Sequence, residues 1–216
     1  VFLLSVQLIS AQESKTLNSW EFQKQDFGGI WEVWRTFKAE ENYWENVELP
    51  HCFNAFDAVN PDVRYYQGKA WYRQMVKIEN SYKNGRTIIH FEGAGQKTTL
   101  WIYNQKVGTH IGGYDEFSFD ITDFVAELKK DERFRNEWNE KIPVAVCIEN
   151  SRDLEMIPSD LSDFFIYGGL YRKVHFEYFS EISVEQLHIT PQLSRNKKSA
   201  DIAIEIKLRN PLKQNE

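Results

Sequence analysis

The chain has 216 residues and a formal net charge of −6 at pH 7, and 42% of its residues are hydrophobic. This length suffices for one sizeable β domain, or for one domain and part of another. The acidic balance excludes nucleic acid as a partner, because phosphate binding needs a basic face. Aromatic residues make up 15% of the chain, which is enough to build a core and to leave rings for a ligand surface.

The chain begins with an apolar run, Val1–Ala11, that ends in small residues. The run is too short to cross a bilayer, so no membrane span is expected. It predicts the remnant of a secretory signal peptide, and therefore a periplasmic or extracellular protein. A first β-strand is the alternative. Export permits a disulfide, but Cys147 lies in an apolar run, so Cys52 and Cys147 are expected to be independent thiols.

Most of the chain that follows is rich in β-branched and aromatic residues, which favour strands. The predicted strands span 70–78, 86–92, 98–104, 116–121, 143–149 and 170–176. Asn84-Gly85 predicts a tight hairpin turn between the first two strands. Short strands with turn signals favour an all-β fold, a β-sandwich. The local pattern leaves a jelly roll and an immunoglobulin-like topology open.

Little helix is expected. A short helical turn is predicted before Pro50, and one helix is predicted over 123–130 with Thr122 as its N-terminal cap. The segment 133–141 is polar and predicts a surface loop.

The pattern changes near residue 180. Apolar and polar residues alternate through 199–208, which predicts a half-buried strand, and 182–189 predicts the strand before it. Two strands are too few to be stable alone. We therefore expect a first domain over 12–179 and the truncated start of a second β domain over 180–216.

The stretch 160–174, DLSDFFIYGGLYRKV, joins carboxylates, aromatic rings and a glycine pair before a predicted strand. The glycines allow a sharp turn that holds Asp163 and its aromatic neighbours at a sheet edge. A carboxylate accepts hydrogen bonds from sugar hydroxyls while flat rings cover the C–H face, so the pattern indicates a sugar contact. The alternative is an aromatic-lined turn in which Asp163 caps backbone N–H groups.

A second candidate lies in the loop 49–57, LPHCFNAFD. Asn54 and Asp57 are candidate ligands for sugar hydroxyls, and an Asx turn or loop packing is the alternative. His51 is expected to brace the loop, and His110 is expected to be a buried, hydrogen-bonded histidine.

Other chemistries lack their signatures in this sequence. There is no clustered His/Cys spacing for zinc, no phosphate loop and no GxSxG turn of a serine hydrolase. Glycosidases need two carboxyl groups roughly 5 to 9.5 Å apart across the scissile bond, which neighbouring acidic residues in a sequence do not establish.

Four stretches in series resemble the N-terminal sugar-binding domain of glycoside hydrolase family 2, which includes β-galactosidases and β-glucuronidases. They are LPHCFNAFD (49–57), YYQGKAWYR (65–73), the run 90–122 and DFFIYGGLYRKV (163–174). The segment ITPQL (189–193) resembles the start of the family's immunoglobulin-like second domain. The resemblance implies a jelly-roll β-sandwich for the first domain and a parent enzyme that hydrolyses terminal β-glycosides with retention.

The family resemblance also implies which domain of the parent enzyme carries the catalytic residues. The family's catalytic glutamates lie in a TIM barrel, so this chain would hold none of them and would be inactive alone. Its partners would be the sugar and its own downstream immunoglobulin-like and TIM-barrel domains. Asp163 matches the family's loop carboxylate, which contacts the sugar and in some galactosidases helps to hold sodium. Asn54 and Asp57 are weaker matches.

The resemblance favours a terminal β-galactoside over a glucuronide, because the stretch GGYDEFSFDIT is more similar to β-galactosidases. No cofactor is expected in this chain, while sodium or magnesium is allowed in the full enzyme. Two other functions are open: a free-standing carbohydrate-binding module, and a structural β-sandwich whose ligand loop has decayed.

Overall fold

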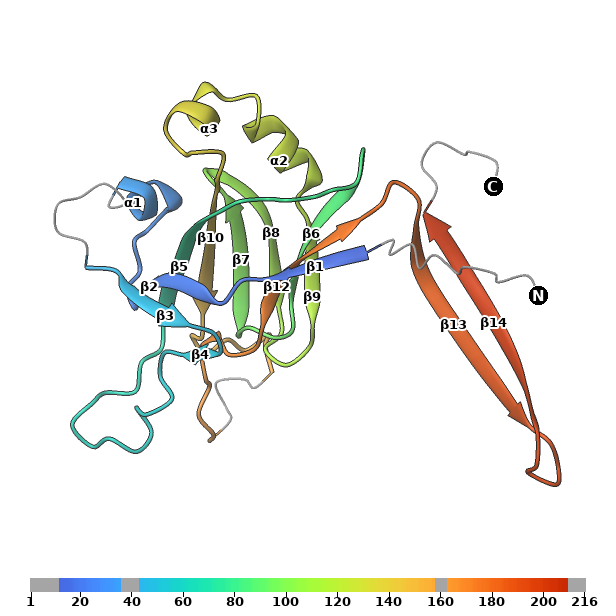
Figure 1. The fold of residues 1–216 in the computed structure, drawn as a ribbon. Coiled ribbons are helices and arrows are strands. Elements are labelled where there is room, and N and C mark those ends of the chain that lie inside the picture. The colour runs from blue at the N-terminus through green and yellow to red at the C-terminus, as the bar shows by residue number, and fades with distance from the viewer. Residues whose placement is uncertain (1–11, 36–42, 158–162, 210–216) are drawn as a thin grey trace. The chain divides into compact units, whose positions relative to one another are not determined.

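The computed structural model describes residues 12–35, 43–157 and 163–209, which divide into two compact units (Figure 1). The larger unit lies within Ser14–Glu79 and Thr87–Glu177, and the smaller unit includes Asn80–Arg86 and the described residues from Tyr178 onward. The predicted signal remnant falls outside the described residues. The domain limit at 179 stays a prediction.

The elements are mainly strands. The helices are α1 (Ile30–Arg35), α2 (Thr122–Leu128) and α3 (Glu132–Asn136). The strands are β1 (Gln12–Thr16), β2 (Ser19–Gln23), β3 (Glu45–Glu48), β4 (His51–Cys52), β5 (Lys69–Val76), β6 (Arg86–Phe91), β7 (Lys97–Ile102), β8 (Gln105–Ile111), β9 (Phe117–Asp120), β10 (Ile142–Glu149), β11 (Gly169–Leu170), β12 (Val174–Phe179), β13 (Ser183–Leu193) and β14 (Ala200–Arg209). Among the described residues, no helix is long and apolar enough to cross a bilayer.

Two sheets form the sandwich. The larger sheet has the strand order β3-β2-β5-β10-β7-β8, and the smaller has the order β1-β12-β6-β9. Their buried side chains fill the space between them, and the largest of these are Trp20, Tyr72, Phe91, Phe176, Ile89, Leu100, Ile102, Ile142 and Ile148. The predicted all-β sandwich is confirmed.

Strand β10 is covered on both of its faces. It pairs with β5 on one side and β7 on the other, and every residue from Ile142 to Ile148 is buried. One face points into the sandwich. On the other face, Ala145 and Cys147 join Ile30 and Val33 of α1 in a second apolar cluster. Burial on two sides explains why this strand is a continuous apolar run without alternation.

Three sequence predictions about local structure were wrong. Strands β5 and β6 belong to different sheets, so the turn at Asn84, whose φ is 57°, reverses the chain between sheets and forms no hairpin. Thr122 opens α2 as a helical residue, and the cap position falls on Ile121 without a side-chain cap. The predicted loop 133–141 contains most of α3, because Asp131 caps that helix and Phe134 is buried beneath it.

Strand limits also differ from the predictions. The strand expected over 170–176 is interrupted into β11 and β12. Strands β1, β2, β3 and β8 were not predicted, because they carry many polar residues on their exposed sides.

Strands β13 and β14 form a separate two-stranded ribbon with one apolar face. Across the ribbon, Val184 pairs with Leu208, Leu187 with Ile206, Ile189 with Ile204 and Pro191 with Ile202. The alternation predicted from the sequence is present. The predicted half-burial of β14 was wrong, because its apolar side chains from Ile202 to Leu208 are 41% to 61% exposed.

Candidate functional site

The candidate site lies on two loops joined by a small sheet, in which β4 pairs with β11. This pairing requires glycines. A Cβ at Gly168 would lie 2.2 Å from the ring of Phe53, and one at Gly169 would lie 2.3 Å from the carbonyl oxygen of His51. Gly169 also has a φ of +141°, which side-chain-bearing residues rarely adopt. The glycine pair therefore lets the loop before β11 approach β4 closely.

A buried cluster of polar groups anchors the loop that carries Asp163. The carbonyl oxygen of Ile166 accepts hydrogen bonds from the Nδ2 atoms of Asn54 (2.9 Å) and Asn150 (3.0 Å) and from the hydroxyl of Tyr65 (2.6 Å). Gly168 N–H donates to Asn54 Oδ1 at 2.9 Å. We call Asn54, Asn150 and Tyr65 the amide clamp.

The amide clamp also binds the neighbouring loop. Asn150 Nδ2 donates to the carbonyl oxygen of Tyr66 at 3.0 Å, and Asn150 Oδ1 accepts from Gly68 N–H at 2.9 Å. Asn54 and Asn150 are 1% and 0% exposed. Buried amides that are fully hydrogen-bonded fix backbone positions, because leaving any partner unpaired carries a desolvation cost.

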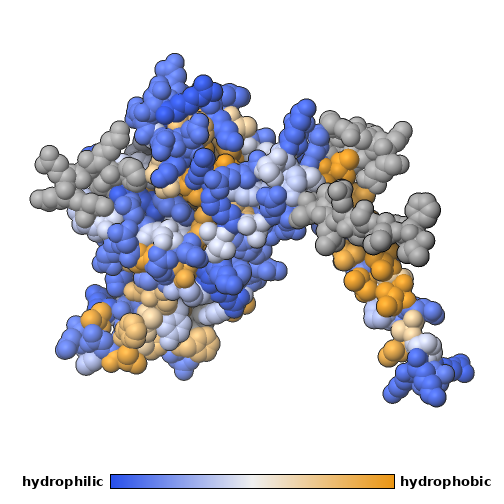
Figure 2. Space-filling model, in the orientation of Figure 1, coloured by the Kyte–Doolittle hydropathy of each residue, from blue (hydrophilic) through white to orange (hydrophobic). Residues whose placement is uncertain are grey.

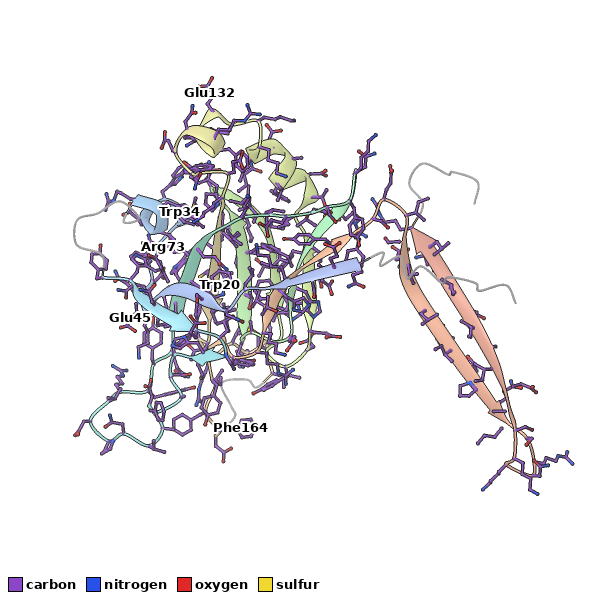
Figure 3. The ribbon with its side chains drawn as sticks, viewed as in Figure 1. Trp20, Trp34, Glu45, Arg73, Glu132 and Phe164 are labelled. Carbon is purple, nitrogen blue, oxygen red and sulfur yellow. The ribbon has the colours of Figure 1, made fainter. Side chains whose placement is uncertain are left out.

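The side chains around the anchor face solvent. Ile166 is buried, while Asp163, Phe164, Phe165 and Tyr167 are exposed. Phe164 lies at the end of the sandwich that the 163–168 loop forms (Figure 3). Apolar side chains gather at this end (Figure 2), and they include Phe56, Val59, Phe164, Phe165 and Tyr167. The loop backbone is fixed by hydrogen bonds, and it exposes the carboxylate of Asp163 to solvent among exposed aromatic side chains.

The structure places the three predicted sugar ligands differently. No described residue donates a hydrogen bond to Asp163, which does not support the alternative of a backbone cap. Asn54 is enclosed in the amide clamp. Asp57 Oδ2 accepts from Tyr66 N–H at 2.9 Å, so it supports the loop 54–66. That all three contact a sugar stays a prediction, and only Asp163 is free of structural bonds within the described chain.

His51 braces this end of the sandwich, as expected. Its Nδ1 lies 2.8 Å from the hydroxyl of Tyr72, and that hydroxyl accepts from Leu170 N–H at 3.4 Å. The tautomer of His51 decides which of the two side chains donates. Burial lowers the pKa of His51 and outweighs the opposite effect of Glu45. Burial therefore favours the neutral form of the His51 imidazole.

His110, Cys52 and Cys147 lie in structural surroundings. The ring of His110 stacks on Phe117 with centroids 3.9 Å apart, and Nε2 lies 3.4 Å from Asp115. The expectation of a buried, hydrogen-bonded histidine was wrong, because His110 is half-buried and its Nε2 has no hydrogen-bond partner among the described residues. Both cysteines are free thiols, and burial raises the pKa of Cys147 to about 12, so it is not a reactive thiolate.

Asp163 does not belong to a cluster that could hold a metal by itself. Within the described ranges, no group of three or more His, Cys, Asp or Glu side chains is placed to bind an ion.

The family follows from the whole of the first domain. The model of the glycosyl hydrolases family 2 sugar-binding domain matches residues 9–178. The chain belongs to this family. Solved β-glucuronidases from Bacteroides uniformis and Parabacteroides merdae are each 46% identical to it, with TM-scores of 0.85 and 0.84 over 92% and 93% of the chain.

Curated family 2 proteins give the same picture. A putative β-glucuronidase of Formosa agariphila is 36% identical over 71% of the chain, and a β-galactosidase of Thermoanaerobacter pseudethanolicus is 30% identical over 70%. The chain spans 17% and 19% of these two proteins and 26% of each of the two solved glucuronidases.

Among the residues of the candidate site, sequence reasoning missed Asn150 and Tyr65. Asn150 follows a buried strand directly, and Tyr65 precedes the stretch QGKAWYR. An amide at the end of a fully apolar strand was the available signal, since a buried polar residue needs a specific partner.

Proposed function

We propose that this family 2 domain forms one wall of the sugar pocket of a retaining β-glycosidase, with Asp163 as its contact to the substrate. The observation that carries the proposal is the exposed carboxylate of Asp163 on a backbone fixed by the amide clamp. Such a carboxylate can accept hydrogen bonds from sugar hydroxyls, and the neighbouring rings can cover the C–H face of the ring.

The chemical role of the chain would be orientation. The groups that cleave the bond would come from another domain, and a rigid loop would hold the sugar over them. Correct placement of reacting groups accounts for a large part of enzymatic rate enhancement, and a misplacement of about 1 Å can cost about 100-fold. Fixing Ile166 and Gly168 with buried amides suits that role.

For the sugar, similarity to solved proteins supports a β-glucuronide, because the two matches at 46% identity are named β-glucuronidases. A β-galactoside is the second candidate, supported by the galactosidase-like stretch GGYDEFSFDIT and by the 30% identical β-galactosidase. The choice between the two sugars stays a prediction, as does export of the protein.

The β13–β14 ribbon fits a further part of the proposal. Its paired apolar side chains form a continuous strip that is open to solvent in the described chain. We propose that further strands of an immunoglobulin-like domain cover this strip in the complete protein, because a two-stranded ribbon is not stable alone.

The test uses the complete protein with aryl β-glucuronide and aryl β-galactoside substrates. Asp163→Ala is expected to lower kcat/KM for the preferred substrate by about 100-fold without changing the melting temperature. Asp62→Ala is the matched control, because Asp62 is another exposed carboxylate in the adjacent loop. Wild-type kinetics for Asp163→Ala would remove this residue from the site.

A free-standing carbohydrate-binding module is the competing function. Calorimetric titration of the 216-residue chain with glucuronic acid and galactose oligosaccharides separates the two. Binding that Asp163→Ala abolishes, in a complete protein that cleaves neither aryl substrate, would favour the module over the enzyme.

A further inference from the structure

An aromatic groove lies in the larger unit, at the end of the sandwich opposite the 163–168 loop. It has a volume of about 550 Å³ and lies between α1, the β7–β8 turn and the segment that joins α3 to β10. The two ends are separated by β10, which runs from Pro143 in the groove to the residue before Asn150 in the amide clamp. Seven residues of strand correspond to about 23 Å. Figure 3 shows Trp34 and Glu132 near one end and Phe164 at the other.

Three aromatic side chains define the groove. Trp34 comes from α1, Tyr103 from the β7–β8 turn, and Trp138 from the segment after α3. The rings of Tyr103 and Trp138 have centroids 5.0 Å apart and a tilt of 52°. All three side chains are half-buried, so each keeps part of its surface exposed.

The rings are held by a rigid arrangement of hydrogen bonds and charges. The guanidinium of Arg133 lies 4.8 Å from the ring centre of Tyr103 and 5.1 Å from that of Trp138. Arg133 also donates to the Tyr103 hydroxyl at 2.8 Å and to both carboxylate oxygens of Asp131. Trp34 Nε1 donates to the carbonyl oxygen of Tyr103 at 2.8 Å. The platform is therefore organised before any ligand arrives.

The backbone around the groove adopts an unusual conformation. Tyr103, Asn139 and Glu140 have φ values of 52°, 49° and 57°, the left-handed region that glycine usually occupies. These are three of the five such non-glycine residues in the described chain. Each costs about 1–3 kcal/mol, and positions of this kind cluster at binding sites. The backbone N–H of Trp138 donates to the Arg133 carbonyl oxygen at 2.9 Å, which holds the backbone at the groove edge.

The charges at the groove select the ligand class. Arg133 is paired with Asp131, and Arg35 is paired with Glu32 at 2.6 Å. The remaining charged side chains of the lining, Glu137 and Lys141, have opposite signs. The groove is thus close to neutral, which does not favour a polyanion. Aromatic side chains beside the amide of Asn139 and the ammonium group of Lys141 match the C–H faces and hydroxyls of a neutral sugar.

We propose that this groove is a second carbohydrate site, which holds a neutral pyranose unit of an oligosaccharide or polysaccharide at a distance from Asp163. The site would retain the protein on a polymeric substrate and would take no part in bond cleavage. This proposal goes beyond the assignment of Asp163, because it needs only the groove.

The experiment measures binding of β-linked oligosaccharides of glucose, xylose and galactose to the complete protein by calorimetry. Trp138→Ala is expected to weaken binding of at least one of them by about tenfold, which is the loss of one aromatic contact of about 1.4 kcal/mol. Asn139→Gly removes the amide of an exposed lining residue, and glycine adopts the φ of 49° at this position without strain, so this variant should weaken binding of the same ligand without affecting the fold. Tyr114→Ala is the matched control, because Tyr114 is an aromatic residue that is 59% exposed and does not line the groove.

Measuring both binding and cleavage in the Trp138→Ala and Asp163→Ala variants separates this site from the one at Asp163. Trp138→Ala should leave cleavage of a small aryl glycoside unchanged, whereas Asp163→Ala should lower that cleavage and leave oligosaccharide binding intact. Loss of oligosaccharide binding in Asp163→Ala with wild-type binding in Trp138→Ala would overturn the groove assignment. So would an equal loss in Tyr114→Ala, or no binding of any oligosaccharide in the panel.

Discussion

The sandwich and the β13–β14 ribbon both contain strands in which apolar and polar side chains alternate. The apolar side chains are buried in the sandwich and exposed in the ribbon. In β12 of the sandwich, Val174, Phe176 and Tyr178 are buried, whereas the corresponding side chains of β14 are open to solvent. Both strands show the same period of two. The two-residue alternation determines which side chains share a face of the sheet. Whether that face is buried depends on another layer of structure that packs against it.

Within the sandwich, the two ends also differ. The end with Asp163 fixes its backbone through buried amides, while the opposite end fixes its side chains through a guanidinium between aromatic rings. The first arrangement positions a loop, and the second prepares a surface.

The largest expected effect tests the difference between sandwich and ribbon directly. Phe91 is fully buried and stacks on Phe117 with centroids 4.8 Å apart. Phe91→Ala is expected to lower the free energy of unfolding of the 216-residue chain by about 3–5 kcal/mol. Ile204→Ala on the ribbon should change it by less than about 0.5 kcal/mol. Urea unfolding of both variants measures this, and a large cost for Ile204→Ala would show that its face is covered in solution.

The next effect concerns the buried amides. Asn150→Ala leaves Gly68 N–H without its acceptor and removes one of the donors to Ile166, so we expect a loss of about 1–3 kcal/mol. The loop that carries Asp163 should loosen as well, which lowers kcat/KM of the complete protein. Asn46→Ala, at an exposed position of β3, is the control. Equal stability of the two variants would contradict the clamp.

The smallest effect is a pH dependence that comes from His51. Burial lowers the pKa of folded His51, while the unfolded residue titrates near about 6.5. The unfolded state therefore binds more protons as pH falls below that value, and the free energy of unfolding decreases. His51→Asn keeps an acceptor for the Tyr72 hydroxyl but cannot titrate. Urea unfolding between pH 5 and 7.5 should show a flatter profile for this variant, and identical slopes would exclude His51 as a cause.

Much of the fold was accessible from local pattern. Most strands with β-branched and aromatic residues were placed close to their observed limits. The glycine pair at 168–169 was expected to make a sharp turn, and the structure shows that it lets the loop approach β4 closely. The pairing of strands was not accessible. Asn84-Gly85 has the chemistry of a hairpin turn, but the buried faces of β5 and β6 belong to different sheets.

The candidate site was predicted in part for the same reason. Asp163 was found because its carboxylate, rings and glycines are adjacent in the sequence. Tyr65 was missed because its hydrogen-bond partner Ile166 is 101 residues away in the sequence. Asn54 was expected to bind a sugar because its actual partner, Gly168, is 114 residues away and was not visible in the local pattern. Whether a polar side chain serves a ligand or the backbone depends on such distant partners.

The sequence alone determined the family, the all-β character and the loop on which a sugar contact would lie, since each follows from residues close together in the chain. The tertiary structure decided which polar groups are bonded internally, which apolar faces are covered, and that Trp34, Tyr103 and Trp138 meet in one groove. Burial and hydrogen bonding are satisfied between segments far apart in the chain, and only folding brings those segments into contact.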